Sequence, residues 1–131
     1  MKTNKQIIEE LSHFTSIILD SAIQVHKEMG PGLLESVYQH CLMKELKDRA
    51  LHVDAMVIVP LHYRGQSLNK DYVIDLLVEG EIIVELKAIE GLLPIHEAQV
   101  ISYLKLANKR IGLLISFNVQ LLKQGFKRFV N

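Results

Sequence analysis

A predicted β-hairpin in the middle of the chain constrains the fold more than any other feature. Two runs rich in β-branched and aliphatic residues, Tyr72–Val78 and Ile82–Leu86, are joined by Glu79-Gly80-Glu81. A short connection that contains glycine, placed between two such runs, predicts a pair of antiparallel strands. A carboxylate interrupts each run, Asp75 the first and Glu85 the second. Because unpaired charge is costly among apolar neighbours, each carboxylate is expected to have a partner.

The length of the hairpin loop decides which of these side chains share a face of the sheet. Glu85 and Lys87 are two residues apart, so their side chains leave the same face. A two-residue loop would pair Asp75 with Val84 and turn Asp75 to the other face, whereas a three-residue loop or a β-bulge would pair Asp75 with Glu85. We predict one of these odd-count arrangements, which gathers two carboxylates and an ammonium group at one place.

Two carboxylates beside an ammonium group suit metal-assisted hydrolysis of a phosphodiester bond. Carboxylate oxygens are hard ligands that hold Mg²⁺ or Mn²⁺ and leave water in the remaining positions. The metal then stabilises charge on the phosphate and activates a water, which a neighbouring lysine can orient or deprotonate. The alternative is a buried structural ion pair between Lys87 and one of the two acids.

The remaining hydrophobic pattern places the hairpin in an α/β domain. Apolar residues at spacings of three and four predict a long helix from Ile7 to Met29 and, after Gly30-Pro31-Gly32, a second helix over residues 34–46. Alternation over Val53–Val59 predicts a strand that ends at Pro60, and His62-Tyr63 is a candidate short strand.

Three further elements are expected beyond the hairpin. They are a helix over about residues 96–108, a strand over Ile111–Phe117 that is apolar on both faces, and a tail, Leu121–Val130, that fits either an edge strand or a short helix. The order α-α-β-β-β-α-β predicts a mixed central sheet flanked by helices.

Length and composition bound the classes of protein that fit. A chain of 131 residues fits one domain, residues 1–131. Fifteen Lys and Arg balance fifteen Asp and Glu, so charge alone does not indicate a nucleic-acid binder, and phosphate contacts would need a local patch or a bound metal. The one cysteine, Cys41, excludes an internal disulfide and a cysteine-rich zinc site. No apolar segment is long enough for a membrane helix and no signal peptide is evident, so we expect a cytoplasmic protein without membrane contact.

Two motifs flank the hairpin. On the helix after it, Gln99 and Tyr103 form a Q-x-x-x-Y pattern whose spacing of four puts both side chains on one face, which His96 joins. Before it, Gly32, Glu35 and Tyr38 form a G-x-x-E-x-x-Y pattern. Without a special role, Glu35 would be a first-turn glutamate favoured by the helix dipole, and Tyr38 is expected to be a core residue with a hydrogen-bonded hydroxyl.

These motifs together resemble one known family. Asp75…Glu85-Leu-Lys87 on a hairpin resembles the PD-(D/E)xK nuclease core, and Q-x-x-x-Y resembles the signature of its RecB-like branch. The G-x-x-E-x-x-Y pattern, with the blocks VHKEMGPGLLESVY, DLLVEGEIIVELKA and HEAQVISYLK, is similar to the GxxExxY family of small bacterial proteins in that superfamily. Ile74 stands where the proline of the superfamily name would be, and Val73 where many relatives carry a basic residue.

The resemblance implies a fold and a set of roles. It implies a restriction-endonuclease-like core in which Asp75 and Glu85 bind Mg²⁺ or Mn²⁺, assisted by Glu35 and the backbone carbonyl of Leu86. Lys87 would be the catalytic lysine. Gln99 and Tyr103 would support the site or touch the nucleic-acid backbone, and His26, from the first helix, is a candidate metal ligand.

The implied reaction is phosphodiester hydrolysis in DNA, with RNA the less favoured substrate. The alternative is a catalytically inactive module that binds nucleic acid or protein and retains the nuclease fold; a role on small phosphorylated molecules is weaker. Since the chain carries no accessory DNA-recognition domain, a second copy in a homodimer or a partner protein would supply further DNA-binding surface.

Overall fold

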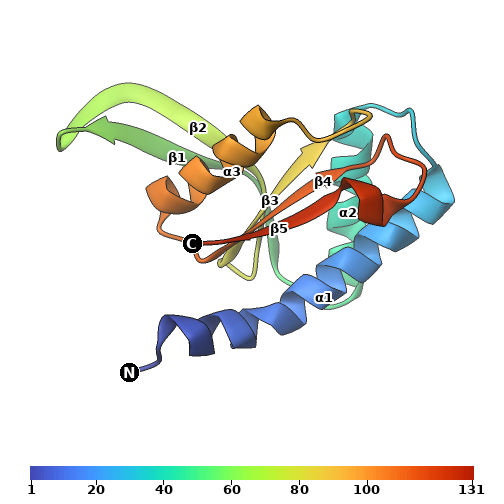
Figure 1. Ribbon diagram of the computed structural model, residues 1–131, viewed down its shortest axis with the longest axis horizontal. Coiled ribbons are helices and arrows are strands. Elements are labelled where there is room, and N and C mark those ends of the chain that lie inside the picture. Colours follow the sequence, from blue (N-terminus) through green and yellow to red (C-terminus); the bar gives the residue numbers. More distant parts are fainter.

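The helices and strands follow the predicted order and add one strand at the end. The computed structural model describes residues 1–131. Its elements are α1 (Asn4–Met29), α2 (Glu35–Asp48), β1 (Val53–Tyr63), β2 (Gln66–Val78), β3 (Ile82–Lys87), α3 (Pro94–Ala107), β4 (Ile111–Ser116), the 3₁₀ helix η1 (Leu122–Gly125) and β5 (Phe126–Val130) (Figure 1). None of the helices combines the length and apolar character needed to cross a bilayer.

Local signals explain where α1 begins and ends. Thr3 caps α1, because its side-chain oxygen accepts a hydrogen bond from the backbone N–H of Gln6 at 3.2 Å while the Gln6 side chain accepts one from the backbone N–H of Thr3 at 2.8 Å. The chain leaves α1 through Gly30 and Gly32, whose φ angles of 70° and 97° lie in the left-handed region that favours glycine.

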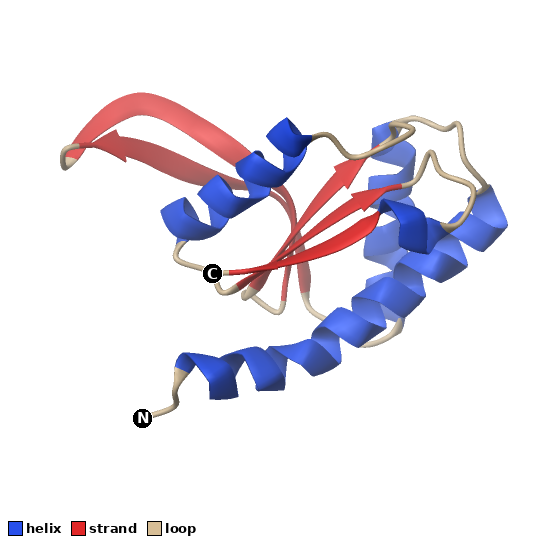
Figure 2. Ribbon diagram, in the orientation of Figure 1, coloured by secondary structure: helices blue, strands red, loops and turns tan.

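The sheet has five strands in the order β1-β2-β3-β4-β5 (Figure 2). β3 and β4 are parallel, and the other three pairs are antiparallel. The parallel pair requires a crossover, which α3 supplies. This mixed sheet flanked by helices is consistent with a restriction-endonuclease-like fold, as predicted.

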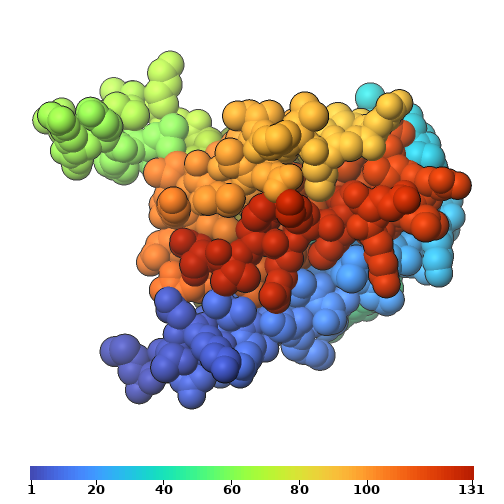
Figure 3. Space-filling view, viewed as in Figure 1, coloured from blue at the N-terminus to red at the C-terminus, as the bar shows by residue number.

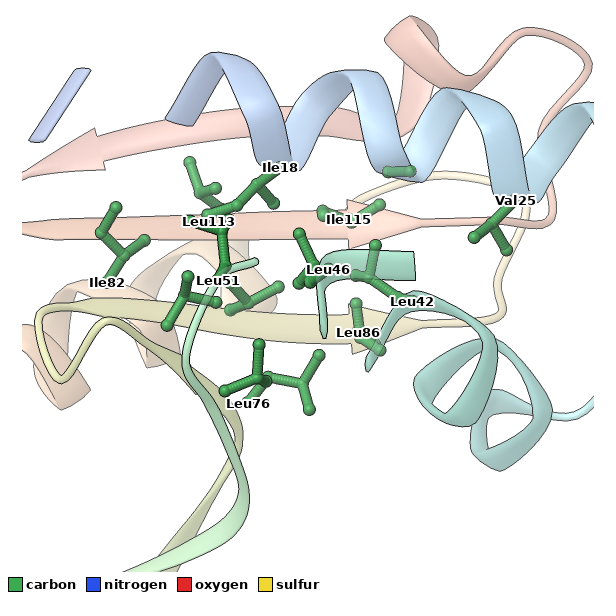
Figure 4. Packing of buried hydrophobic residues seen from close by; sticks show 14 of the residues in the cluster. Ile18, Val25, Leu42, Leu46, Leu51, Leu76, Ile82, Leu86, Leu113 and Ile115 are labelled. Carbon is green, nitrogen blue, oxygen red and sulfur yellow. The ribbon is translucent and has the colours of Figure 1, made fainter. Parts of the chain in front are cut away.

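The core lies in two layers, one on each face of the sheet. The larger cluster packs the sheet against α1 and α2, with Ile18, Leu42 and Leu86 fully buried (Figure 4). The smaller cluster packs the other face against α3 and includes Val100 and Leu104. α3 approaches β4 so closely that a Cβ at Gly112 would lie 2.7 Å from Val100 Cγ1.

The β1–β2 ribbon leaves the sheet at Asp75. β2 pairs with β3 only over Leu76–Val78, whereas its pairing with β1 continues to the turn at Arg64 and Gly65. Leu76 faces the larger cluster but Ile74 faces the smaller one, although residues two apart share a face of a regular strand. The ribbon therefore twists through Asp75, opposite Met56, whose φ of 54° is left-handed.

Several predicted boundaries were wrong. β1 does not end at Pro60 but runs on to Tyr63 with a register shift between Pro60 and His62. Proline is tolerated there because β1 is an edge strand. β2 starts at Gln66 and not at Tyr72. The pattern of the sequence does not predict a strand over residues 66–71 because these residues are exposed and show no apolar alternation. The tail forms both of the alternatives considered for it, η1 and then β5.

Candidate active site

The hairpin loop brings Asp75 and Glu85 opposite each other. Val78 pairs with Ile82 and Leu76 with Val84, which leaves the three residues Glu79-Gly80-Glu81 as the loop. The predicted odd-count loop is confirmed. Extending this register by one residue sets Asp75 against Glu85, on the face of the sheet that α3 covers.

Beyond Leu76, side-chain carboxylates replace backbone carbonyls as the hydrogen-bond acceptors between β2 and β3. Asp75 Oδ2 accepts a hydrogen bond from the backbone N–H of Leu86 at 2.8 Å, and Glu85 Oε1 accepts one from the backbone N–H of Asp75 at 3.4 Å. Amides in a buried strand need acceptors, and a diverging partner strand no longer offers its carbonyls. The two carboxylates thus satisfy the amides where β2 parts from β3, which we call the fork (residues 75, 85 and 86).

The carboxylate pair is electrostatically strained. Only 7% of Glu85 is exposed. Burial first, and then repulsion by the Asp75 carboxylate, raise the pKa of Glu85 to about 8, although the Asp75 N–H and the Lys87 ammonium act in the opposite direction. A second positive charge close to the pair would favour ionised Glu85.

Lys87 supplies a charge to the site without forming an ion pair. Its ammonium lowers the pKa of both Glu35 and Glu85, so it lies near both carboxylates. It takes part in none of the ion pairs of the structure, which argues against the alternative of a structural ion pair. The end of β3 is held in place, because Lys87 O accepts from Phe117 N at 3.0 Å and buried Ser116 hydrogen-bonds with the backbone of Ile89.

Glu35 faces the site from the first turn of α2. Partial burial is the main cause that raises the pKa of its carboxyl; Lys87 lowers it, Asp75 raises it and His96 lowers it. The charges of Lys87, Asp75 and His96 therefore all act on Glu35. His96 lies in the first turn of α3, where its Nδ1 accepts from Leu93 N at 3.1 Å.

Structural roles explain the first and last residues of the G-x-x-E-x-x-Y pattern, Gly32 and Tyr38. The buried Tyr38 hydroxyl donates to Gly30 O at 2.6 Å and accepts from Leu33 N at 3.1 Å, while its ring stacks on Phe117 at a centroid distance of 4.4 Å. The expected core role of Tyr38 is confirmed. Tyr38 and the left-handed Gly32 fix the turn that sets the start of α2, and the start of α2 positions Glu35.

An aromatic pair borders the carboxylates. The rings of Tyr72 and Tyr103 are stacked at 4.2 Å and 6°, and the Tyr72 hydroxyl donates to Tyr103 O at 3.0 Å. Burial and then the Glu85 and Asp75 charges raise the pKa of Tyr103, and burial is the main cause that raises the pKa of Tyr72 to about 12. The sequence does not single out Tyr72, because an aromatic residue in an apolar strand indicates only a core position.

Two other predicted residues make no hydrogen bond with the carboxylates. Gln99 is exposed on α3, one turn before Tyr103, and its side chain makes no hydrogen bond. His26 is buried, and its Nε2 lies 2.7 Å from Val119 O, a contact that ties α1 to the segment after β4. The structure therefore gives His26 a contact with a backbone carbonyl.

The donor set suits a divalent cation that keeps much of its water. No group of three or more His, Cys, Asp or Glu side chains lies at metal-binding spacing. Mg²⁺, however, is commonly held by one or two carboxylates together with water and substrate phosphates. The mutually repelling carboxylates of Asp75 and Glu85 fit that mode, with the backbone of Leu86 beside them.

Comparison with known proteins identifies a family for this site. The family model of the PD-(D/E)XK nuclease superfamily matches residues 12–129. The matched range contains Glu35, both strands of the hairpin and α3, and so the whole site described above. No curated protein and no solved structure shows a significant match.

Proposed function

The chain belongs to the PD-(D/E)XK nuclease superfamily, and from this premise we propose that it is a nuclease that hydrolyses phosphodiester bonds in DNA with Mg²⁺ or Mn²⁺. One observation carries the proposal: two repelling carboxylates, buried Glu85 and half-buried Asp75, lie beside the unpaired ammonium of Lys87. RNA is the less favoured substrate. Within the superfamily we assign the chain to the GxxExxY family, with the Q-x-x-x-Y pattern of the RecB-like branch, as one nuclease-like domain over residues 1–131.

We assign the roles as follows. Asp75 and Glu85 hold the metal, and Glu35 and the Leu86 carbonyl assist. When bound, the metal would stabilise charge on the phosphate and lower the pKa of a water. Lys87 orients the attacking water or stabilises the negative charge that develops on the phosphate, since no carboxylate neutralises its ammonium.

The α3 side chains act beside this centre. Tyr103 presents its hydroxyl close to both carboxylates and is held there by the stack on Tyr72. Gln99 is exposed and so is free to contact the nucleic-acid backbone.

The second candidate is a catalytically inactive module with the same fold. The zero net charge favours this inactive module, and so does Val73, which stands where a basic residue would assist phosphate binding. A homodimer or a partner protein would then bring the remaining nucleic-acid surface.

A cleavage assay separates the two. Wild type, Lys87→Ala and the control Lys105→Ala, an exposed lysine of α3, are incubated with linear, circular and single-stranded DNA and with RNA, with Mn²⁺ or EDTA. We expect metal-dependent cleavage of DNA by wild type and by Lys105→Ala and loss of at least about a hundredfold in Lys87→Ala. If wild type binds Mn²⁺ but cleaves none of the substrates, the inactive module is the better description.

A further inference from the structure

The β1–β2 ribbon extends past the fork as an arm, defined as residues 57–74. Figure 3 shows it as a green projection that stands out from the body of the molecule. Because β3 pairs with no residue of β2 before Leu76, the arm has no third strand. A two-stranded ribbon is marginal by itself, and this one is supported on one face by α3.

The other face of the arm has no partner in the chain. Ile58 and Val73 form a cross-strand pair on it and are 63% and 39% exposed. At the tip, Tyr63 is 62% exposed and the Arg64 guanidinium lies 5.5 Å from the centre of its ring. An exposed apolar surface of this kind is typical of a binding site.

The charges of the arm favour a polyanion. Residues 57–74 include three exposed basic residues, His62, Arg64 and Lys70, against one acidic residue, Asp71. None of the basic side chains forms an ion pair within the chain. The chain as a whole is neutral, so the arm is locally basic on a balanced molecule.

A second copy of the chain is a poorer fit to the arm. It would add a strand to one of the two free edges of the arm. On the β1 edge Pro60 lacks an N–H donor and the register shifts between Pro60 and His62, and on the β2 edge Asn69 has a left-handed φ of 54° that interrupts the strand. Proline and irregular pairing on an edge strand are features that oppose edge-to-edge pairing. A ligand that contacts side chains, and not the strand edge, is favoured.

The shape and reach of the arm match duplex DNA. A two-stranded ribbon fits the major groove, which is about 12 Å wide. From Asp75 at the root of the arm to Gln66 at its tip there are nine residue steps, or about 30 Å at ~3.3 Å per residue. At ~3.4 Å per base pair, the tip reaches at most about 9 base pairs from a phosphate at the fork.

We propose that the arm is a DNA-binding element that lies along a groove of the duplex, with Arg64 and Lys70 on phosphates up to about 9 base pairs from the scissile bond. This inference rests on the proposed function, since it takes DNA as the ligand of the fork. The exposed Ile58–Val73 face would contact the sugars or base edges of the groove.

The test measures binding separately from cleavage. Binding of a fluorescent 30-base-pair duplex is followed by anisotropy with Ca²⁺ in the Lys87→Ala background, over a series of salt concentrations. The arm variant is Arg64→Asn/Lys70→Gln; asparagine suits the left-handed φ of 51° at residue 64 and forms the preferred Asn-Gly turn with Gly65. The matched control is Lys5→Gln/Lys47→Gln, two exposed lysines of α1 and α2 without ion pairs.

We expect the arm variant to bind at least about tenfold more weakly at low salt, with a salt slope less steep by about 2, and the control to match the parent. Parent affinity should rise with duplex length until one flank reaches about 9 base pairs, and the arm variant should lose this dependence. Equal affinity and slope in parent and arm variant overturn the inference. So does an Ile58→Glu variant that changes the oligomeric state without changing DNA binding, which would identify an interface between copies.

The two proposals fail in different ways. Wild type that binds DNA through the arm without cutting it overturns the nuclease activity and leaves the arm intact. Wild type that cuts DNA while the arm variant binds and cuts normally overturns only the arm. Absence of both binding and cleavage overturns both.

Discussion

Replacing Glu85 by glutamine should stabilise the metal-free protein at alkaline pH. The folded state raises the pKa of Glu85 from its ordinary 4.5 to about 8, through burial and repulsion by Asp75. Between these values the folded protein holds a proton that the unfolded chain has released, so the free energy of unfolding falls as pH rises. A shift of this size corresponds to on the order of 5 kcal/mol, and the whole penalty is present above pH 8. Glutamine keeps an oxygen for the Asp75 N–H but never ionises.

The assay is urea unfolding in EDTA between pH 5 and pH 9, followed by far-ultraviolet circular dichroism. The difference between Glu85→Gln and wild type should grow with pH and level off above pH 8, while the exposed Glu81→Gln control should follow wild type. Adding Mn²⁺ should recover wild type at high pH and have little effect on Glu85→Gln, because the cation replaces the proton as the partner of the carboxylate pair. A difference that is the same at pH 5 and pH 9 would refute this account of the fork.

Three further predictions concern packing, the turn before α2 and metal affinity. Gly112→Ala should lower the free energy of unfolding by about 1–3 kcal/mol, because the new methyl group would clash with Val100. The control is Gly91→Ala, where a Cβ meets nothing within 4 Å. Equal unfolding midpoints for the two variants would count against the close α3–β4 contact. Tyr38→Phe should lower the free energy of unfolding by about 1–2 kcal/mol and speed hydrogen exchange at the Leu33 amide, which loses its acceptor. An unchanged exchange rate at Leu33 would show that the Tyr38 hydroxyl does not hold the turn. Calorimetry with Mn²⁺ should find a larger loss of affinity in Asp75→Asn than in Glu35→Gln, because Asp75 is hydrogen-bonded into the fork and Glu35 is not. The reverse order would mean that the cation binds mainly to Glu35.

The sequence predicts the fork well because local rules decide it. Two apolar runs and a three-residue connection containing glycine leave few registers, and only an odd count sets the two acids opposite each other. The helices are also accurate to within a few residues, since their apolar periodicity is long. The Asp75–Glu85 arrangement follows from hairpin geometry alone.

Features that depend on distant partners could not be predicted. His26 meets Val119 across 93 residues of sequence, and nothing near either residue signals the contact. Tyr72 looks like any core aromatic until α3 brings Tyr103 against it. The arm was missed over residues 66–71 because a ribbon that is exposed on both sides has no apolar alternation to detect.

The same two side chains of the fork serve as proposed metal ligands and as hydrogen-bond acceptors for the backbone. Asp75 and Glu85 supply the acceptors for the amides of Leu86 and Asp75 where the strands part. If both acids were replaced by side chains without a hydrogen-bond acceptor, the amides of Leu86 and Asp75 would lose their partners, and we expect β2 and β3 to pair over a greater length and the arm to change direction. Relatives with apolar residues at these two positions should therefore show longer β2–β3 pairing, so that the length of the pairing indicates whether the acceptors were retained.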